Sequence, residues 1–206
     1  MKLLSFVWNR VLALVSTAVL LSVLLLLFLG YRAATVSQTD NEQRIQTKHD
    51  YLTKIANTSI VSRAPNIVFI LYDDMGYGDI GVGAQGSKMI ATPHIDNLAQ
   101  AGVMLSDFHS PSPVCTPSRT GYLTGRLAPR AGMPYVVFPT QSTKALAFSA
   151  LTKPDANTRL PAEEITLADL LKAAGYATGM VGKWHLGDKS PSLPNDMGFD
   201  SYFGAL

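Results

Sequence analysis

The longest apolar run of the chain lies near its N-terminus, where the 21 residues from Val11 to Tyr31 carry no charge. A helix rises about 1.5 Å per residue, so a helix of this length spans a hydrocarbon core of about 30 Å. Lys2 and Arg10 precede the run, which is typical of a cytoplasmic flank. We therefore expect a transmembrane segment at residues 11–31, with residues 1–10 in the cytoplasm.

A cleaved secretory signal peptide is the alternative interpretation of this segment. Its apolar region is usually shorter, about 7–15 residues, and a cleavage site with small residues follows it. The nearest small pair, Ala33-Ala34, puts Arg32 where a small residue is required. We favour an uncleaved signal-anchor, with the bulk of the chain in the lumen of the endoplasmic reticulum or lysosome, or outside the cell. Cleavage would instead make the product secreted.

Residues 32–64 are polar and show little sustained periodicity, which favours a stalk. Ile45, Leu52 and Ile55 can share one helical face, but three residues are too few to predict a coiled coil. Asn57-Thr58-Ser59 is an N-glycosylation sequon. It agrees with an exported glycoprotein.

The pattern changes at residue 65, where a globular region begins that we extend to residue 206. The run from Asn66 to Tyr72 is continuously apolar, rich in β-branched and aromatic residues, and bounded by Pro65 and Asp73. This pattern predicts a central parallel strand buried on both faces.

Helical and strand patterns then alternate along the chain, which predicts an α/β fold with a parallel sheet. Ligands of such sheets bind beyond the carboxyl ends of the strands. The expected elements are a helix from Thr92-Pro93 to Gly102, a strand from Val103 to Phe108, a helix from Thr166 to Gly175 with Asp169 in a capping box, and a strand from Tyr176 to Val181.

Composition and charge narrow the class of protein. The chain has 206 residues, 47% of them hydrophobic and 16% charged, which is too apolar for a disordered protein. The net charge of +2 resides entirely in Lys2 and Arg10, because residues 32–206 hold 15 basic and 15 acidic side chains. This distribution indicates membrane topology and excludes a nucleic-acid partner as the default.

Asp73 and Asp74 stand at the carboxyl end of the first expected strand, followed by the flexible turn Met75-Gly76-Tyr77-Gly78-Asp79. Two adjacent carboxylates repel each other, and a hard divalent cation would relieve that repulsion. A solvated acidic turn is the alternative.

Cys115 is the only cysteine of the chain and lies in the segment Cys115-Thr116-Pro117-Ser118-Arg119. Pro117 suits the first helical position, which would place Cys115 just before a helix N-terminus, where negative charge is favoured. Arg119 can return over the first turn and add fixed positive charge. A buried, inert thiol is the usual alternative, but these neighbours predict an anion site and a lowered thiol pKa, so a plain cysteine nucleophile remains open.

Several segments together resemble the sulfatase family, most closely its arylsulfatase A and N-acetylgalactosamine-6-sulfatase group. The resemblance covers about residues 65–206 and implies an alkaline-phosphatase-like sandwich with a mostly parallel central sheet, incomplete here. The matching segments are Cys115 to Arg119 with Leu123-Thr124-Gly125-Arg126, Asn66 to Asp79, Thr92-Pro93-His94-Ile95-Asp96, and Gly182-Lys183-Trp184-His185-Leu186-Gly187.

The resemblance implies that a formylglycine-generating enzyme oxidises Cys115 to formylglycine. In the family the hydrated aldehyde attacks the sulfur of a sulfate ester with one hydroxyl, and the other hydroxyl expels sulfate. Asp73 and Asp74, with the modified Cys115, would hold a divalent cation, usually calcium. Arg119 would orient the diol, Lys183 would contact the sulfate, and His185 would assist deprotonation of the second hydroxyl.

Lys183 and His185 follow the last expected strand directly, and residues i and i+2 of an extended segment point to the same side. We therefore expect one site to receive both side chains, although a surface lysine and a hydrogen-bonded histidine are the alternative. His49, His94 and His109 are expected to be structural or solvated.

Family members are much longer than this chain and take a second metal-binding pair, another Lys and another His from later segments. We therefore expect a fragment with little activity alone. Two alternatives remain open: a phosphoester or phosphonate hydrolase of the same superfamily, and a non-catalytic membrane-tethered remnant.

Overall fold

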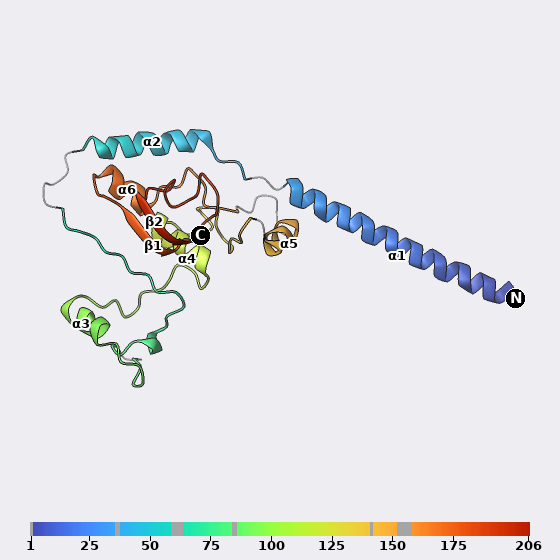
Figure 1. Ribbon diagram of the computed structural model, residues 1–206, viewed down its shortest axis with the longest axis horizontal. Coiled ribbons are helices and arrows are strands. Elements are labelled where there is room, and N and C mark those ends of the chain that lie inside the picture. The colour runs from blue at the N-terminus through green and yellow to red at the C-terminus, as the bar shows by residue number, and fades with distance from the viewer. Residues whose placement is uncertain (1, 36–37, 59–63, 84–85, 141, 152–157) are drawn as a thin grey trace.

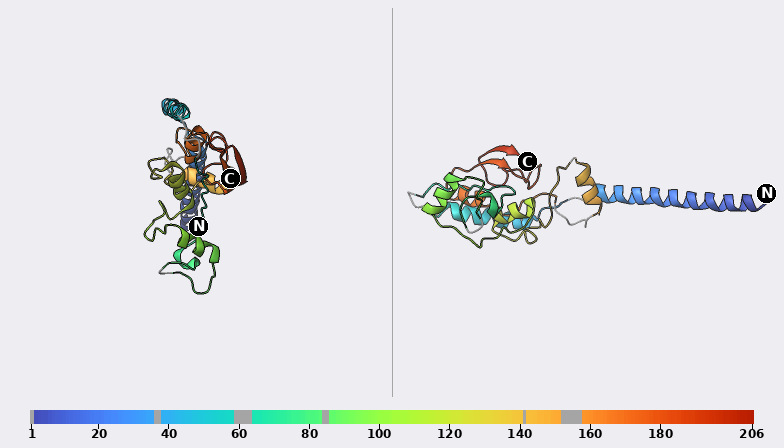
Figure 2. Two further views of the ribbon diagram at one scale, coloured as in Figure 1. Left: turned by 90° about the vertical axis from the view of Figure 1, so that its left-hand side faces the viewer. Right: turned by 90° about the horizontal axis from the view of Figure 1, so that it is seen from below.

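The computed structural model describes residues 2–35, 38–58, 64–83, 86–140, 142–151 and 158–206. Helix α1 projects from the body of the protein, and α5 lies beside its C-terminal end (Figures 1 and 2). The elements in chain order are α1 (Lys2–Thr35), α2 (Glu42–Ala56), the 3-10 turn η1 (Tyr77–Asp79), α3 (Pro93–Ala101), α4 (Cys115–Thr124), α5 (Thr143–Leu151), α6 (Leu167–Ala173), β1 (Gly179–Lys183) and β2 (Ser201–Ala205).

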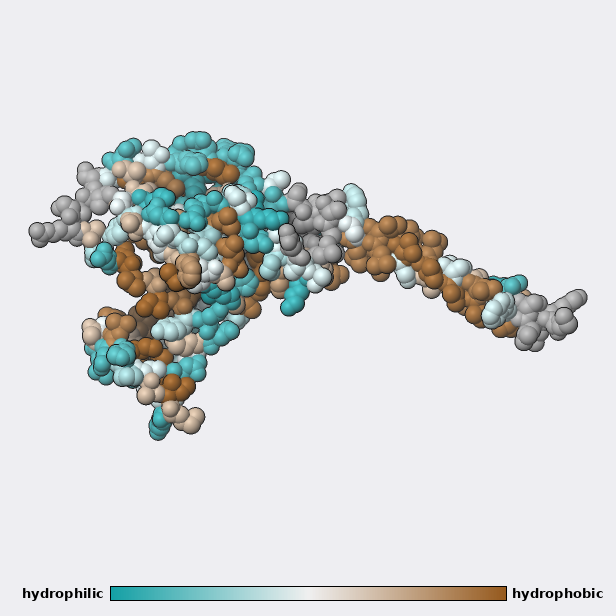
Figure 3. Space-filling model, viewed as in Figure 1, coloured by the Kyte–Doolittle hydropathy of each residue, from teal (hydrophilic) through white to brown (hydrophobic). Residues whose placement is uncertain are grey.

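Among the described residues, one helical segment, Phe6–Arg32, is long and apolar enough to cross a membrane, and none of its most apolar stretch is buried in the protein. Its apolar side chains form the continuous hydrophobic surface of α1 in Figure 3. A signal sequence near an N-terminus has the same length and composition. The transmembrane segment therefore stays a prediction.

Helix α2 occupies the region expected as a stalk and packs against α6. It begins at Asn41, whose side chain accepts a hydrogen bond from the Arg44 amide. The face predicted from Ile45, Leu52 and Ile55 is the half-buried face of the helix. The sequon follows at its exposed end, where Ser59 lies outside the described residues.

Lys48 lies on the same face of α2 and is only 7% exposed. Its ammonium pairs with Asp169 of α6 at 2.9 Å and donates to the carbonyl of Glu164 at 2.8 Å. Glu164, also buried, accepts from Arg44 of α2 and from Arg126, just after α4. The segment that precedes the globular region is therefore held to it by ion pairs rather than standing apart from it.

Helices α3 and α6 are the elements that the sequence predicted best, and Thr92 and Gly102 cap α3 as expected. Thr166 and Asp169 form the expected capping box at the start of α6. Strand β1 begins at Gly179 and ends at Lys183, so the predicted strand from Tyr176 to Val181 is displaced by two to three residues. It pairs in parallel with β2, with Gly179 opposite Ser201 and Lys183 opposite Ala205.

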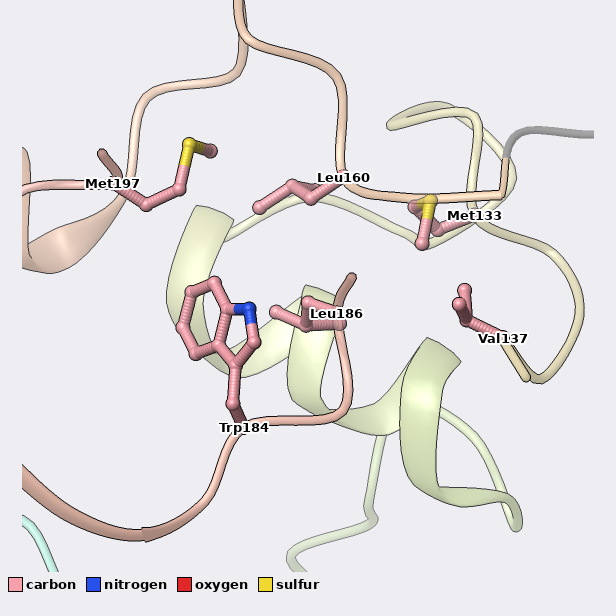
Figure 4. Close-up of a cluster of buried hydrophobic side chains, with 6 residues drawn as sticks. All are labelled: Met133, Val137, Leu160, Trp184, Leu186 and Met197. Carbon is pink, nitrogen blue, oxygen red and sulfur yellow. The ribbon is translucent and has the colours of Figure 1, made fainter. Parts of the chain in front are cut away.

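A hydrophobic core lies between α4, β1 and the loops that follow them (Figure 4). Trp184 and Leu186 point into it from the segment after β1 and are fully buried. The Trp184 indole N–H donates to the carbonyl of Ser192 at 2.9 Å. The remaining members are Met133, Val137, Leu160 and Met197.

Two predicted strands are wrong for this structure. Residues 66–72 and 103–108 make no sheet ladder, and their apolar side chains are largely solvent-exposed, with Val68 81% and Val103 86% exposed. The described residues form a sheet of only two strands, β1 and β2, so the mostly parallel central sheet is present only in part. An apolar run becomes a central strand only where neighbouring strands satisfy its backbone on both sides.

A cavity of about 410 Å³ separates residues 67–73 from β1. Every second residue of this segment lines the cavity, as expected for an extended chain that turns one side toward it: Ile67, Phe69, Leu71 and Asp73. Figure 3 shows hydrophobic residues gathered around the hollow between the region of α3 and the rest of the body. The predicted strand thus has the right periodicity but no hydrogen-bonded neighbour.

The ion pair of Lys48 gives a test of the docking of α2. Lys48→Met removes the ammonium and leaves the buried Asp169 carboxylate without its cation, so we expect the free energy of unfolding to fall by about 3 kcal/mol. Urea denaturation in detergent, followed by circular dichroism, measures this value. Lys54→Met, at an exposed position of the same helix, is the control and should change it little. Equal stability of the two variants would show that the ion pair does not hold α2.

Candidate active site

Cys115 is the first residue of α4, and Val114 is the N-cap. The Ser118 amide donates to the Val114 carbonyl at 3.1 Å and closes the first turn. Pro117 therefore occupies the third helical position, and the prediction that it opens the helix is wrong by two residues. A proline is tolerated there because the first turn has no intrahelical acceptors for its N–H groups.

The structure brings Cys115, Asp73 and Lys183 together from distant parts of the chain. The Lys183 ammonium lies 2.8 Å from Asp73 Oδ2 and 3.4 Å from Cys115 Sγ. Cys115 Sγ lies 3.7 Å from Asp73 Oδ1. Each side chain thus contacts both others, at the carboxyl end of β1 where ligands of parallel sheets bind.

Arg119 extends from α4 into the same cluster and is only 8% exposed. Its guanidinium lies 3.6 Å from Asp73 Oδ2 and donates to the main-chain carbonyl of Lys183. Arg119 therefore adds a fixed positive charge to the cluster. It contacts Asp73 and the main chain of Lys183. The cluster holds two cations and one carboxylate.

These contacts set the charge states of Asp73 and Lys183. The hydrogen bond from Lys183, with the positive charges of Lys183 and Arg119, lowers the pKa of Asp73 despite partial desolvation. The same bond raises the pKa of Lys183, and Cys115 adds to that rise. Both groups are therefore charged at neutral pH, and in the cluster of Asp73, Lys183 and Arg119 two cations meet one carboxylate.

His185 has a left-handed backbone with φ of 62°, so the extended geometry assumed for Lys183 and His185 does not hold. Its Nε2 lies 2.9 Å from the Val137 carbonyl, and its Nδ1 is buried without a hydrogen-bond partner in the described residues. Burial lowers the pKa of His185, and the positive charges of Lys183 and Arg119 lower it further. The imidazole is therefore neutral near pH 7 and has a bare nitrogen that can accept a proton.

Asp74 also has a positive φ, of 59°, and its exposed carboxylate makes no hydrogen bond or ion pair within the described residues. No group of three or more His, Cys, Asp or Glu side chains in the described ranges is arranged to hold a metal ion. The two adjacent carboxylates are the right kind of donor for calcium, which takes about six to eight oxygen ligands. They can supply only part of such a coordination sphere.

Sequence reasoning missed Thr116 and Val137, which connect the site internally. Thr116 is fully buried, and its hydroxyl joins α4 to the main chain of His185 and of Val137. Thr116 lies inside the segment from Cys115 to Arg119 that resembles the family. The sequence does not indicate which group a threonine hydroxyl or a main-chain carbonyl will bond to.

Comparison with known proteins identifies the family of the region that contains this cluster. The family model described as Sulfatase matches residues 65–206, which is the part of the chain that contains the whole cluster. The chain belongs to the sulfatase family. The resemblance found in the sequence is thus confirmed.

Related proteins match the same region. Human arylsulfatase A is 41% identical over 155 residues, which cover 74% of this chain and 27% of the relative. Mouse N-acetylgalactosamine-6-sulfatase is 43% identical over 141 residues, covering 68% and 25%, and dog arylsulfatase G is 44% identical over 140 residues, covering 68% and 23%. The chain therefore spans about a quarter of the length of these relatives.

Solved structures share the fold, and one of them is described as a sulfatase. PsFucS1 sulfatase from Pseudoalteromonas sp. superposes with a TM-score of 0.55 at 33% identity and covers 80% of this chain and 29% of that one. The structure of Ps i-CgsB gives a TM-score of 0.58 at 38% identity, covering 69% and 28%. The sulfatase fold class predicted from the sequence is thus confirmed by structural similarity, while the described residues form only a short part of the parallel sheet.

The Asp73–Lys183 pair predicts a specific pH response. Lys183→Met should raise the pKa of Asp73 toward its ordinary value, because the largest stabilising interaction of the carboxylate is lost. Carbon-13 NMR titration of labelled aspartate side chains measures this shift. Lys172→Met is the control, because Lys172 pairs with Asp200 elsewhere.

The sign of the stability effect follows from the lowered pKa. Asp73 contributes stability above its unfolded pKa of about 3.9, and this contribution is lost as pH falls through the lower folded value. The stability difference between wild type and Lys183→Met should therefore shrink on acidification. An Asp73 pKa that is the same in both proteins would contradict the pairing.

Proposed function

We propose that this chain supplies the nucleophile and the anion-binding residues of a sulfuric ester hydrolase of the arylsulfatase type. The observation that carries the proposal is the contact of Cys115 with Lys183 and Asp73 at the first turn of α4, within a segment that matches the sulfatase family. A sulfate ester is an anion, and a site with excess positive charge beside a nucleophile suits it. The substrate class is therefore a sulfate ester.

The residues of the cluster have distinct roles in this proposal. Lys183 contacts the sulfate, and Arg119, which is kept in place by the Lys183 carbonyl, orients the diol at position 115. Neutral His185 accepts a proton at its bare Nδ1 during departure of the sulfate. The low exposure of Arg119 keeps its charge unscreened.

Cys115 is the residue that a formylglycine-generating enzyme would oxidise. Formylglycine supplies a hydrated aldehyde, whose two hydroxyls allow attack on sulfur and later release of sulfate. Cys115 is half-exposed at the first turn of α4. Catalytic roles are accordingly assigned to Cys115, Arg119, Lys183 and His185.

Asp73 and Asp74, with the modified Cys115, would hold one divalent cation, calcium by resemblance. The donor chemistry fits, because Asp73 already lies beside Cys115 and carboxylate oxygens are hard ligands. When bound, the cation would offset negative charge on the transferring group. Lys183 and Arg119 balance the charge of the Asp73 carboxylate in the structure.

We also propose that residues 11–31 anchor the protein in a membrane as a single span, with the remainder lumenal or extracellular. The exposed apolar surface of α1 and the basic residues before it support this topology. The formylglycine-generating enzyme and the membrane are thus the expected partners, and no nucleic acid is expected.

The function is tested at Cys115. The full-length gene product, made together with the formylglycine-generating enzyme, should carry formylglycine at position 115, as measured by mass spectrometry of the corresponding peptide. Hydrolysis of an aryl sulfate should rise with the extent of conversion. Cys115→Ser should abolish turnover, because serine lacks the second hydroxyl, and it should accumulate a sulfoserine adduct.

An aryl phosphate of the same leaving group is the control substrate in this experiment. Faster turnover of the phosphate would favour the phosphoester hydrolase alternative. Full aryl sulfate turnover by Cys115→Ser, or by protein with an unmodified thiol, would show that another group is the nucleophile. Conversion without turnover of either ester would favour the non-catalytic alternative.

The metal proposal has its own test. Asp73→Asn keeps the side-chain shape but removes one anionic ligand, so calcium affinity should fall by about one order of magnitude. Isothermal titration calorimetry with calcium chloride measures this on the full-length protein. Asp107→Asn, at a fully exposed side chain, is the control and should leave the affinity unchanged. Unchanged affinity in Asp73→Asn would remove Asp73 from the cation site.

A further inference from the structure

A single buried hydroxyl connects three segments around the site. Thr116 Oγ1 donates to the main-chain carbonyl of His185 at 2.9 Å and accepts from the main-chain amide of Val137 at 3.1 Å. Thr116 is fully buried, so both partners would be left without a hydrogen bond if this hydroxyl were removed. The hydroxyl therefore fixes His185 and Val137 relative to α4.

Val137 in turn holds the His185 ring, because its carbonyl lies 2.9 Å from Nε2. A carbonyl oxygen can only accept, so Nε2 of the neutral ring carries the proton and Nδ1 is bare. Three hydrogen bonds thus connect Thr116, Val137 and His185 in a closed cycle. One of these bonds holds the main chain of His185, and another holds its imidazole.

The backbone of His185 needs such support. A φ of 62° is uncommon for a residue with a side chain and persists only where the surroundings fix it. Trp184 and Leu186, fully buried in the core, anchor the chain on either side (Figure 4). The bond from Thr116 then fixes the carbonyl between them.

We propose that Thr116 is a positioning residue that sets the ring orientation and the tautomer of His185. It contacts neither substrate nor the reacting atoms and acts through His185 and Val137. Its catalytic consequence rests on the proposed function, whereas its effect on the His185 tautomer does not. With Thr116 in place, Nδ1 is the nitrogen that is free to exchange a proton.

Thr120 provides a matched control for a merely structural role. It lies one turn further along α4, is also fully buried, and its hydroxyl donates to the Thr116 carbonyl at 2.9 Å. Thr120→Val and Thr116→Val remove the same group from the same helix. Among these two, only Thr116 bonds to the segments that hold His185.

The tautomer is measured by nitrogen-15 NMR of the full chain in detergent micelles, with labelled histidine. The chain has four histidines, and His185→Asn identifies the signals of His185. We expect the Nε2–H tautomer in the wild type and in Thr120→Val. Thr116→Val should show a mixture of both tautomers, and Thr116→Ser, which keeps the hydroxyl, should restore the wild-type signals.

A wild-type tautomer in folded Thr116→Val would overturn the proposal, and so would the same mixture in Thr120→Val. If Thr116→Val does not fold, hydrogen exchange of the Val137 amide in the wild type decides the question. Slow exchange would support its bond to the buried Thr116 hydroxyl, and exchange as fast as that of exposed amides would overturn it.

Kinetics of the full-length gene product on an aryl sulfate add a second readout. Thr116→Val should lower kcat by about 10- to 100-fold with little change in KM, because the base is displaced while Lys183, which contacts the sulfate, stays in place. Thr116→Ser should recover most of the loss. If the wild type lacks sulfatase activity, the proposed function fails, and the tautomer measurement still decides the role of Thr116.

Discussion

The site depends on hydrogen bonds that hold the main chain of residues 183–185, at the end of β1, to helix α4 on one side and to strand β2 on the other. The carbonyls of Lys183 and His185 accept hydrogen bonds from Arg119 and Thr116 of α4. The amide of Trp184, between them, donates to the carbonyl of Ala205 at the end of β2. Because the backbone is fixed alternately to the helix and to the neighbouring strand, Lys183 is directed toward Cys115, and the Trp184 indole is directed into the core.

Charge distribution follows from this arrangement. Lys183 and Arg119 both contact the Asp73 carboxylate, so two cations and one carboxylate meet beside the Cys115 thiol. Burial leaves the His185 imidazole neutral within the same field. In the proposed function, anion binding and proton acceptance therefore belong to different residues, which is what transfer of a charged group requires.

The N-terminal region is also part of this architecture. Glu164 binds Arg44 of α2 and Arg126 after α4, while Lys48 binds the aspartate that caps α6. The expected polar stalk thus contains a helix that is bonded directly to α6 and that is linked through Glu164 to Arg126, just after α4. Such docking limits the conformations available between α1 and the site, in contrast to a flexible tether.

Local patterns in the sequence determined the family, the capping box of α6, the apolar character of α1 and the residues that are proposed to carry the chemistry. Each of these depends on neighbouring positions, such as Thr166 with Asp169 or Cys115 with Arg119. Tertiary structure alone decided that Asn66 to Tyr72 is not a paired strand, since pairing requires backbone partners from elsewhere in the chain. It likewise decided the left-handed backbone of His185, the buried pair of Lys48 and the role of the Thr116 hydroxyl. These features depend on contacts between residues about 20 to 120 positions apart, which local periodicity does not encode.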